Sequence, residues 1–157
     1  MKQLLLLVFC AFSLLTGCAS CDKDGAEPGT VNNNNNNTNP TGGKMKIKIG
    51  NQTFTATLYD NATAAGFQSM LPMTVNMVEL NRNEKYVDLS RGLPANASNP
   101  GTIQTGDLML YGFNTLVLFY KTFSTSYSYT RLGRIDDITG LAGAVGSGNI
   151  TVTFELE

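Results

Sequence analysis

The feature that most constrains this fold is a series of short segments within residues 44–157 in which apolar and polar side chains alternate. Residues 45–49 and 52–59 alternate on either side of a Gly50-Asn51 turn, which predicts a β-hairpin. Further strands are predicted at residues 74–80, 85–89, 107–111, 115–121, 126–132 and 149–156. About eight strands in so short a chain would leave unpaired sheet edges exposed. We therefore expect a mainly β fold in which an antiparallel sheet closes into a barrel.

Two short helices are expected to cap the open ends of this barrel. Asp60-Asn61 offers side-chain oxygens that accept the free N–H groups of a first helical turn, which predicts a helix over residues 62–71. The second helix is predicted over residues 136–145 or 137–145, before a glycine-rich turn. Residues 90–105 are rich in Gly, Pro and Asn and are predicted to form one long loop.

One predicted hairpin, residues 107–121, is apolar on both faces. The first face carries Leu108, Leu110, Leu116, Leu118 and Tyr120. The second face carries Met109, Tyr111, Val117 and Phe119. A barrel strand needs apolar side chains only on its inner face. The hairpin is therefore either buried on both sides or carries an apolar patch outside, and such a patch would be a binding surface.

Two other groups of side chains allow more than one interpretation. Three acidic residues lie on neighbouring predicted strands: Glu79, Glu84 and Asp88. They would form either a carboxylate pair for glycoside hydrolysis or, as we prefer, a solvated face. Three aromatic residues follow the two-faced hairpin: Phe123, Tyr127 and Tyr129. They would either stack on a ligand or cover one end of the barrel.

Composition excludes several kinds of chemistry. The 157-residue chain has no histidine and no tryptophan, and the last of its three cysteines is Cys21. Ser-His-Asp and Cys-His nucleophile systems and histidine-based metal sites are therefore absent, and the predicted barrel has no thiolate. We expect no metal and no cofactor. Eleven Lys and Arg residues balance twelve Asp and Glu residues, for a formal charge of −1, so we expect no nucleic acid partner.

The N-terminus predicts a lipid anchor. Residues 1–17 have a charged start, an apolar run too short for a permanent membrane-spanning helix, and small residues before Cys18, as in a secretory signal peptide. Leu15-Thr16-Gly17-Cys18 resembles the bacterial lipobox, which implies that Cys18 becomes the lipidated first residue. The protein would then be anchored in the bacterial cell envelope, and Ala19 favours the outer membrane over the inner one. The alternatives are an ordinary secreted protein or an apolar first helix.

The lipidated cysteine is followed by a predicted disordered tether, residues 18–43. This segment contains Asn, Gly and Pro residues with almost no apolar side chains, so ordering it would cost entropy without burying apolar surface. Cys10 would leave with the signal peptide and Cys18 would carry the lipid, so only Cys21 remains and the mature monomer has no internal disulfide.

Several motifs carry a family resemblance that spans nearly all of residues 45–157. They are Leu58-Tyr59-Asp60-Asn61-Ala62-Thr63-Ala64, Leu71-Pro72-Met73-Thr74, Glu84-Lys85-Tyr86 and the segments 106–112, 116–120 and 129–135. The order of elements resembles the cyclophilin fold, an eight-stranded antiparallel barrel closed by two helices. It is more similar to a bacterial cyclophilin-like family of largely unassigned function. The resemblance implies a barrel domain over residues 44–157, and relatives accompany flavodoxin-like proteins, which implies such a partner here.

The residues of true cyclophilins transfer only in part. Their Ser-Gln-Phe-Phe-Ile motif falls on residues 115–119 or one position later, so Phe119 would match a proline-pocket phenylalanine, and the glutamine has no counterpart. Their Phe-His-Arg motif is missing, and Arg91 is the nearest candidate for its arginine. Prolyl isomerisation breaks no covalent bond, so it needs no general base, but it needs a donor placed on the twisted amide.

We therefore expect a lipid-anchored cyclophilin-like domain that binds a peptide segment, a protein or a small molecule without catalysing a reaction. The expected recognition residues are Tyr111, Phe119, Tyr129 and Arg131, with Arg91 as a further candidate. The alternative is a divergent peptidyl-prolyl cis-trans isomerase.

Overall fold

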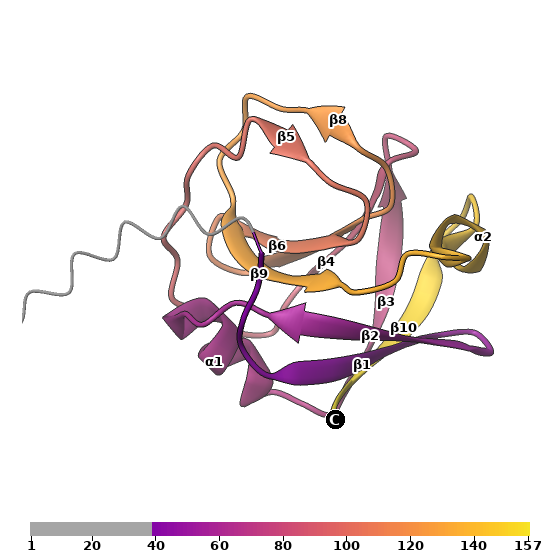
Figure 1. Ribbon diagram of the computed structural model, residues 1–157, viewed down its shortest axis with the longest axis horizontal. Coiled ribbons are helices and arrows are strands. Elements are labelled where there is room, and N and C mark those ends of the chain that lie inside the picture. Colours follow the sequence, from indigo (N-terminus) through magenta and orange to yellow (C-terminus); the bar gives the residue numbers. More distant parts are fainter. Residues whose placement is uncertain (1–38) are drawn as a thin grey trace, which may run out of the picture. The chain divides into compact units, whose positions relative to one another are not determined.

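The computed structural model describes residues 39–157, which form a closed antiparallel β-barrel (Figure 1). The barrel strands are β1 (Lys44–Ile49), β2 (Gln52–Leu58), β3 (Met73–Leu80), β4 (Glu84–Asp88), β6 (Asp107–Tyr111), β7 (Thr115–Phe119), β9 (Thr130–Ile135) and β10 (Ile150–Leu156). Their order around the barrel is β1-β10-β3-β4-β7-β6-β9-β2. The expected mainly β fold, with eight barrel strands and two short helices in the described residues, is confirmed.

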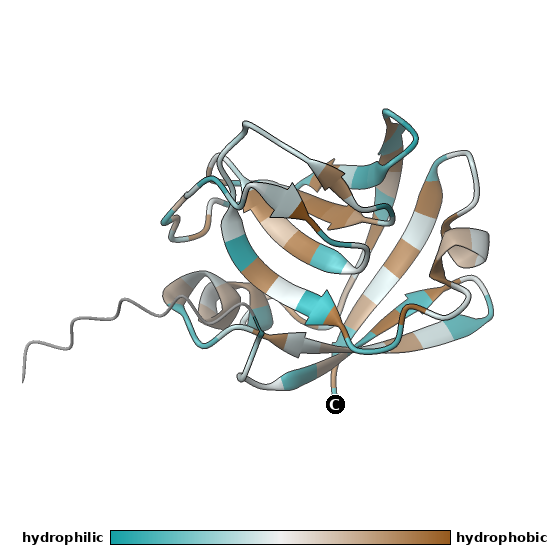
Figure 2. Cartoon of the chain, turned by 45° about the horizontal axis from the view of Figure 1, so that its top comes forward, coloured by the Kyte–Doolittle hydropathy of each residue, from teal (hydrophilic) through white to brown (hydrophobic). Residues whose placement is uncertain are grey.

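Alternation along the strands fills the barrel, as the banded strands in Figure 2 show. In β1, Met45, Ile47 and Ile49 are buried, whereas the intervening lysines point away from the core. The turn that follows is possible because Gly50 adopts φ +59, which glycine reaches without steric cost. Apolar side chains from all eight barrel strands therefore join one core cluster.

The two helices contribute to the same core. In α1 (Ala62–Gln68), the Asn61 side chain accepts a hydrogen bond from the Ala64 N–H, as predicted. Phe67 of this helix packs edge-on against Phe154 with 5.5 Å between ring centroids. Helix α2 (Leu141–Val145) buries both of its terminal side chains in the core cluster.

The two-faced hairpin is β6–β7, and it is buried on both sides over most of its length. Its inner face joins the barrel core. On its outer face, Met109, Val117 and Phe119 form a second cluster with Ile103 and Tyr129. The cover is a flap, which we define as residues 98–105 and 122–129, and which contains the two-stranded sheet of β5 (Thr102–Ile103) and β8 (Phe123–Ser124) (Figure 1). The predicted loop thus contains a strand.

Three predicted elements have boundaries that differ from the structure by more than two residues. Helix α1 ends at Gln68 rather than at residue 71, because the N–H groups of Met70 and Leu71 bond to carbonyl oxygens three residues back, which tightens the last turn. Helix α2 starts at Leu141, since Asp137 instead accepts a hydrogen bond from the Thr139 N–H and holds a turn. The strand predicted at 126–132 lies at Thr130–Ile135, because residues 125–129 cross the outer face as part of the flap.

A buried ion pair ties the loop after α2 to the barrel. Lys85 is fully buried, pairs with Glu79 across β3–β4, and donates to the carbonyl oxygens of Gly146 (3.2 Å) and Gly148 (2.6 Å). The hydroxyl of Tyr120 also donates to Glu79, at 2.8 Å. All the polar atoms of this network have partners, which is the condition for a buried charge to be tolerated.

Replacing Lys85 should therefore destabilise the barrel. We expect Lys85→Met to lower the free energy of unfolding by about 3–5 kcal/mol, because it leaves a largely buried carboxylate and two loop carbonyls without a donor. Urea denaturation followed by circular dichroism measures the change. The matched control is Lys48→Met, which removes an exposed ion pair with Glu155 and should cost at most about 1 kcal/mol. Equal losses in the two variants would contradict this account.

The same network predicts a pH dependence. Burial alone would raise the pKa of Glu79, but hydrogen bonds from Lys85, Tyr120 and the Arg82 N–H outweigh it and hold the pKa below the ordinary value of 4.5. The stabilisation is therefore fully present above that value and is lost as the pH falls through the folded-state pKa. We expect Glu79→Gln to cost about 2–4 kcal/mol at neutral pH and progressively less in acid. Urea titrations across acidic pH test this, and a cost independent of pH would refute it.

Candidate functional site

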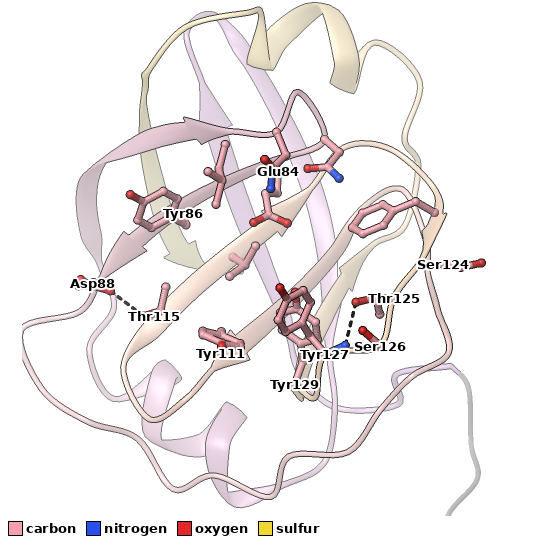
Figure 3. Close-up of a pocket in the computed structure, with 15 residues that line it drawn as sticks. Glu84, Tyr86, Asp88, Tyr111, Thr115, Ser124, Thr125, Ser126, Tyr127 and Tyr129 are labelled. Carbon is pink, nitrogen blue, oxygen red and sulfur yellow. Dashed lines mark hydrogen bonds between the residues drawn. The ribbon is translucent and has the colours of Figure 1, made fainter.

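A groove of about 580 Å³ lies on the outer face of the barrel, between the β3–β4 turn and the flap (Figure 3). Its floor is formed by outward-facing side chains of β4, β6 and β7, and one wall is formed by residues 123–127 and Tyr129. The volume falls in the range of about 300–1,000 Å³ that is usual for ligand sites. The groove therefore begins where the flap stops covering the outer face of the two-faced hairpin.

Strand register places the floor residues in rows. Tyr86 of β4 pairs with Val117 of β7, and two residues further along β4, Asp88 pairs with Thr115. Thr115 in turn pairs with Tyr111 of β6. Because side chains alternate along a strand, these residues share the outer face with Glu84, which pairs with Phe119. Residues from three strands thus meet in one hollow.

The aromatic side of the groove is a set of three tyrosines, two of which contact the ring of the third, Tyr111. The ring of Tyr111 lies 6.2 Å from that of Tyr127 and 5.6 Å from that of Tyr129. Tyr129 is buried and packs edge-on against Phe119, whereas Tyr111 and Tyr127 are 46% and 61% exposed. Burial raises the pKa of the Tyr129 hydroxyl to about 12, and the charge of Glu84 adds to the shift. These rings offer flat apolar faces and hydroxyl groups to a ligand.

The acidic side of the groove consists of two carboxylates. The Asp88 carboxylate accepts a hydrogen bond of 2.6 Å from the Thr115 hydroxyl. The Glu84 side chain is partly buried, and among the described residues it has no hydrogen bond or ion pair. Burial raises the pKa of Glu84 above its ordinary value, and the charge of Glu79 adds to this shift. No lysine or arginine of residues 39–157 lines the groove.

The structure brings together only some of the predicted recognition residues. Tyr111 and Tyr129 line the groove, and Phe119 lies fully buried behind Tyr129. Arg131 lies elsewhere, 5.9 Å from the centre of the Tyr59 ring. Arg91 donates hydrogen bonds to Ser69 and to the carbonyl oxygen of Gly66 at α1.

Three groove residues on β4 were given other roles in the sequence analysis or none. Glu84 and Asp88 were assigned to a solvated face together with Glu79, but Glu79 lies in the Lys85 network, and Glu84 and Asp88 line the groove. Tyr86 was not singled out as a binding residue. Alternation along β4 could have shown that Glu84, Tyr86 and Asp88 share one face of the strand. It could not show that β7 lies beside β4, and this pairing is what brings the three side chains next to Thr115 and Val117.

Residues 39–157 contain neither a metal-binding cluster of side chains nor a membrane-spanning helix. No group of three or more acidic, histidine or cysteine side chains in that part of the chain could hold a metal ion. No helix in the described part is long and apolar enough to span a bilayer. The predicted signal peptide, Cys18 and most of the tether lie outside the described residues.

A closed eight-stranded antiparallel barrel with two short helices and a groove on its outer face is a barrel of the cyclophilin type. A family model described as "Cyclophilin-like family" matches residues 47–155, so the chain belongs to the cyclophilin-like family. The solution structure of the hypothetical protein AF2241 from Archaeoglobus fulgidus is similar in fold, with a TM-score of 0.52 and 16% sequence identity. That likeness covers 77% of this chain and 99% of the archaeal one. A comparison with curated proteins finds no match.

Phe119 and Tyr127 differ in burial: Phe119 supports the groove from below, whereas Tyr127 is exposed and can touch a ligand. We expect Phe119→Ala to lower the free energy of unfolding by about 3–5 kcal/mol, because the ring is fully buried between Phe123 and Tyr129. Tyr127→Ala should change it by about 0.5 kcal/mol or less, because that ring is 61% exposed. Thermal and urea unfolding of both variants measure these changes. A mild effect of Phe119→Ala would mean that the flap does not cover a true core.

Proposed function

We propose that this cyclophilin-like domain binds a peptide segment or a small ligand in the groove and does not chemically convert it. The observation that carries the proposal is the groove itself: three contacting tyrosines, two carboxylates and the apolar side chain of Val117 within about 580 Å³. Concave sites with aromatic walls and a few polar groups are typical of ligand binding. The flap supports this role, because it forms one wall of the groove and is itself held in place by the second hydrophobic cluster.

Catalysis of prolyl isomerisation is the second candidate, and the geometry argues against it. That reaction needs a donor held against the nitrogen of the twisted amide. Both arginines considered for that role are engaged outside the groove, Arg91 at α1 and Arg131 at Tyr59. The neutral hydroxyl and amide groups of the lining are weaker donors than a guanidinium.

The proposal for the whole chain adds the lipid anchor. Lipidation of Cys18 would hold the domain at the bacterial envelope, on the outer membrane, with residues 18–43 as a spacer. The support is the N-terminal sequence alone. A flavodoxin-like protein is the partner implied by the family resemblance, and it would act by contact, because the described residues supply no redox group.

Mass spectrometry of the mature protein from a bacterial membrane fraction tests the anchor. The expected result is an N-terminal Cys18 that carries acyl chains, and a Cys18→Ala variant that leaves the membrane fraction. An intact Met1, or cleavage without acylation, would refute it.

An amide-shift titration tests the binding role. We expect a mixture of random hexapeptides to shift backbone amides of residues 115–119 and 123–129 of the isotope-labelled full chain. Tyr127→Ala should weaken this response about tenfold, because it removes an exposed aromatic anchor. Phe113→Ala is the matched control, since Phe113 is 66% exposed but does not line the groove. Shifts confined to other surfaces would refute the site.

A protease-coupled assay with an alanyl-proline p-nitroanilide peptide separates binding from catalysis. The expected result is no acceleration of cis-trans exchange over the uncatalysed rate. Acceleration that disappears in Tyr127→Ala and persists in Phe113→Ala would establish the isomerase alternative.

A further inference from the structure

We propose that the ligand of the groove is a peptide segment that presents a cationic side chain, lysine or arginine, to Glu84. This inference rests on the proposed binding function and specifies the chemical class of its ligand. It depends on three observations: a carboxylate without a partner, an aromatic wall next to it, and a lining without positive charge.

The first observation is the isolation of Glu84 compared with other carboxylates of the domain. Four of the described acidic side chains are paired with lysine or arginine, and they are Glu79, Asp107, Asp136 and Glu155. Glu84 is partly buried and lines the groove, yet none of the described residues gives it a hydrogen bond or an ion pair. A carboxylate withdrawn from water without a partner costs free energy. A cation bound in the groove would recover that cost.

The second observation is the aromatic wall that faces this charge. Glu84 lines the same groove as Tyr111, Tyr127 and Tyr129. Figure 3 shows Glu84 and the three tyrosines projecting toward the same hollow. The faces of tyrosine rings attract ammonium and guanidinium groups, and partial removal from water strengthens the attraction. A carboxylate next to tyrosine faces is therefore suited to a cation with an apolar stem.

The third observation concerns the other polar atoms of the lining. Asp88 adds a second negative charge at the β4 end of the groove. Arg82 belongs to the β3–β4 turn but does not line the groove. The lining thus carries two carboxylates and, among the described residues, no lysine or arginine, which disfavours phosphate, carboxylate and other anionic ligands.

The volume favours a peptide over an isolated amine. A single lysine side chain would fill only part of about 580 Å³, and the tyrosine and Val117 surfaces remain available to the neighbouring residues of a peptide. Tyr111 and Tyr127, both exposed at the rim, extend this contact beyond the buried part of the groove.

Two acetylated, amidated peptides that differ at one side chain test the inference. The first is Ala-Tyr-Lys-Tyr-Ala, and in the second norleucine replaces lysine, so that length and apolar stem are kept while the charge is removed. Both are titrated into the isotope-labelled full chain, and the amide shifts of residues 115–119 and 123–129 are followed. We expect the lysine peptide to bind at least about tenfold more tightly, with an advantage that shrinks as salt is added.

Two carboxylate-to-amide variants assign the effect to Glu84. Glu84→Gln keeps the shape of the side chain and should abolish most of the preference for the lysine peptide. Glu155→Gln, a change in an exposed ion pair on β10, should leave the preference unchanged. An arginine peptide measures whether guanidinium is bound as well as ammonium, and binding of either cation through Glu84 supports the inference.

The outcomes separate the two proposals. Equal binding of the lysine and norleucine peptides at the groove would overturn the cationic ligand and leave the binding role standing. A preference for lysine that survives in Glu84→Gln would overturn it as well. Absence of shifts in the groove with every peptide would overturn both proposals.

Discussion

The structure depends on the β6–β7 hairpin, whose two faces are both apolar and must both be covered. The inner face completes the barrel core, and the outer face would remain in contact with water without the flap. Burying Met109, Val117 and Phe119 under Ile103 and Tyr129 gives the flap a stable position. The cover is incomplete, however, and the uncovered remainder is the groove. The need to bury the outer face of this hairpin thus accounts for the flap, the second hydrophobic cluster and the candidate site.

The treatment of charge separates the scaffold from the site. Inside the barrel, Lys85 and Glu79 satisfy one another together with Tyr120 and two loop carbonyls, so these charges stabilise one arrangement. In the groove, Glu84 has no such partner among the described residues, although burial raises its pKa. Perturbed groups in a cleft that lack a structural partner are candidates for function. The contrast between Glu79 of β3, which is paired, and Glu84 of β4, which is not, is what points to a ligand.

Sequence reasoning succeeded where the interaction is local or periodic, and it failed where it depended on distant partners. The Asn61 cap and the two-faced hairpin follow from spacing along a few residues, and both are confirmed. The short strand β5 was missed, because a segment of two residues is too short to show an alternating pattern. It is a strand only because it pairs with β8. Arg131 and Arg91 were grouped with the tyrosines by chemistry, but their contacts with Tyr59 and Ser69 place them elsewhere.

By itself, the amino-acid sequence determined the barrel class, the absence of histidine and thiolate chemistry from the folded part, and the excess of apolar surface on one hairpin. These properties depend on composition and on alternation, and both can be read along the chain. Only the tertiary structure decided that Glu84 and Tyr129 line one groove and that Glu79 turns inward to Lys85. Adjacent residues of a strand point to opposite faces, but which strands lie beside each face is set by barrel closure, which joins residues far apart in sequence.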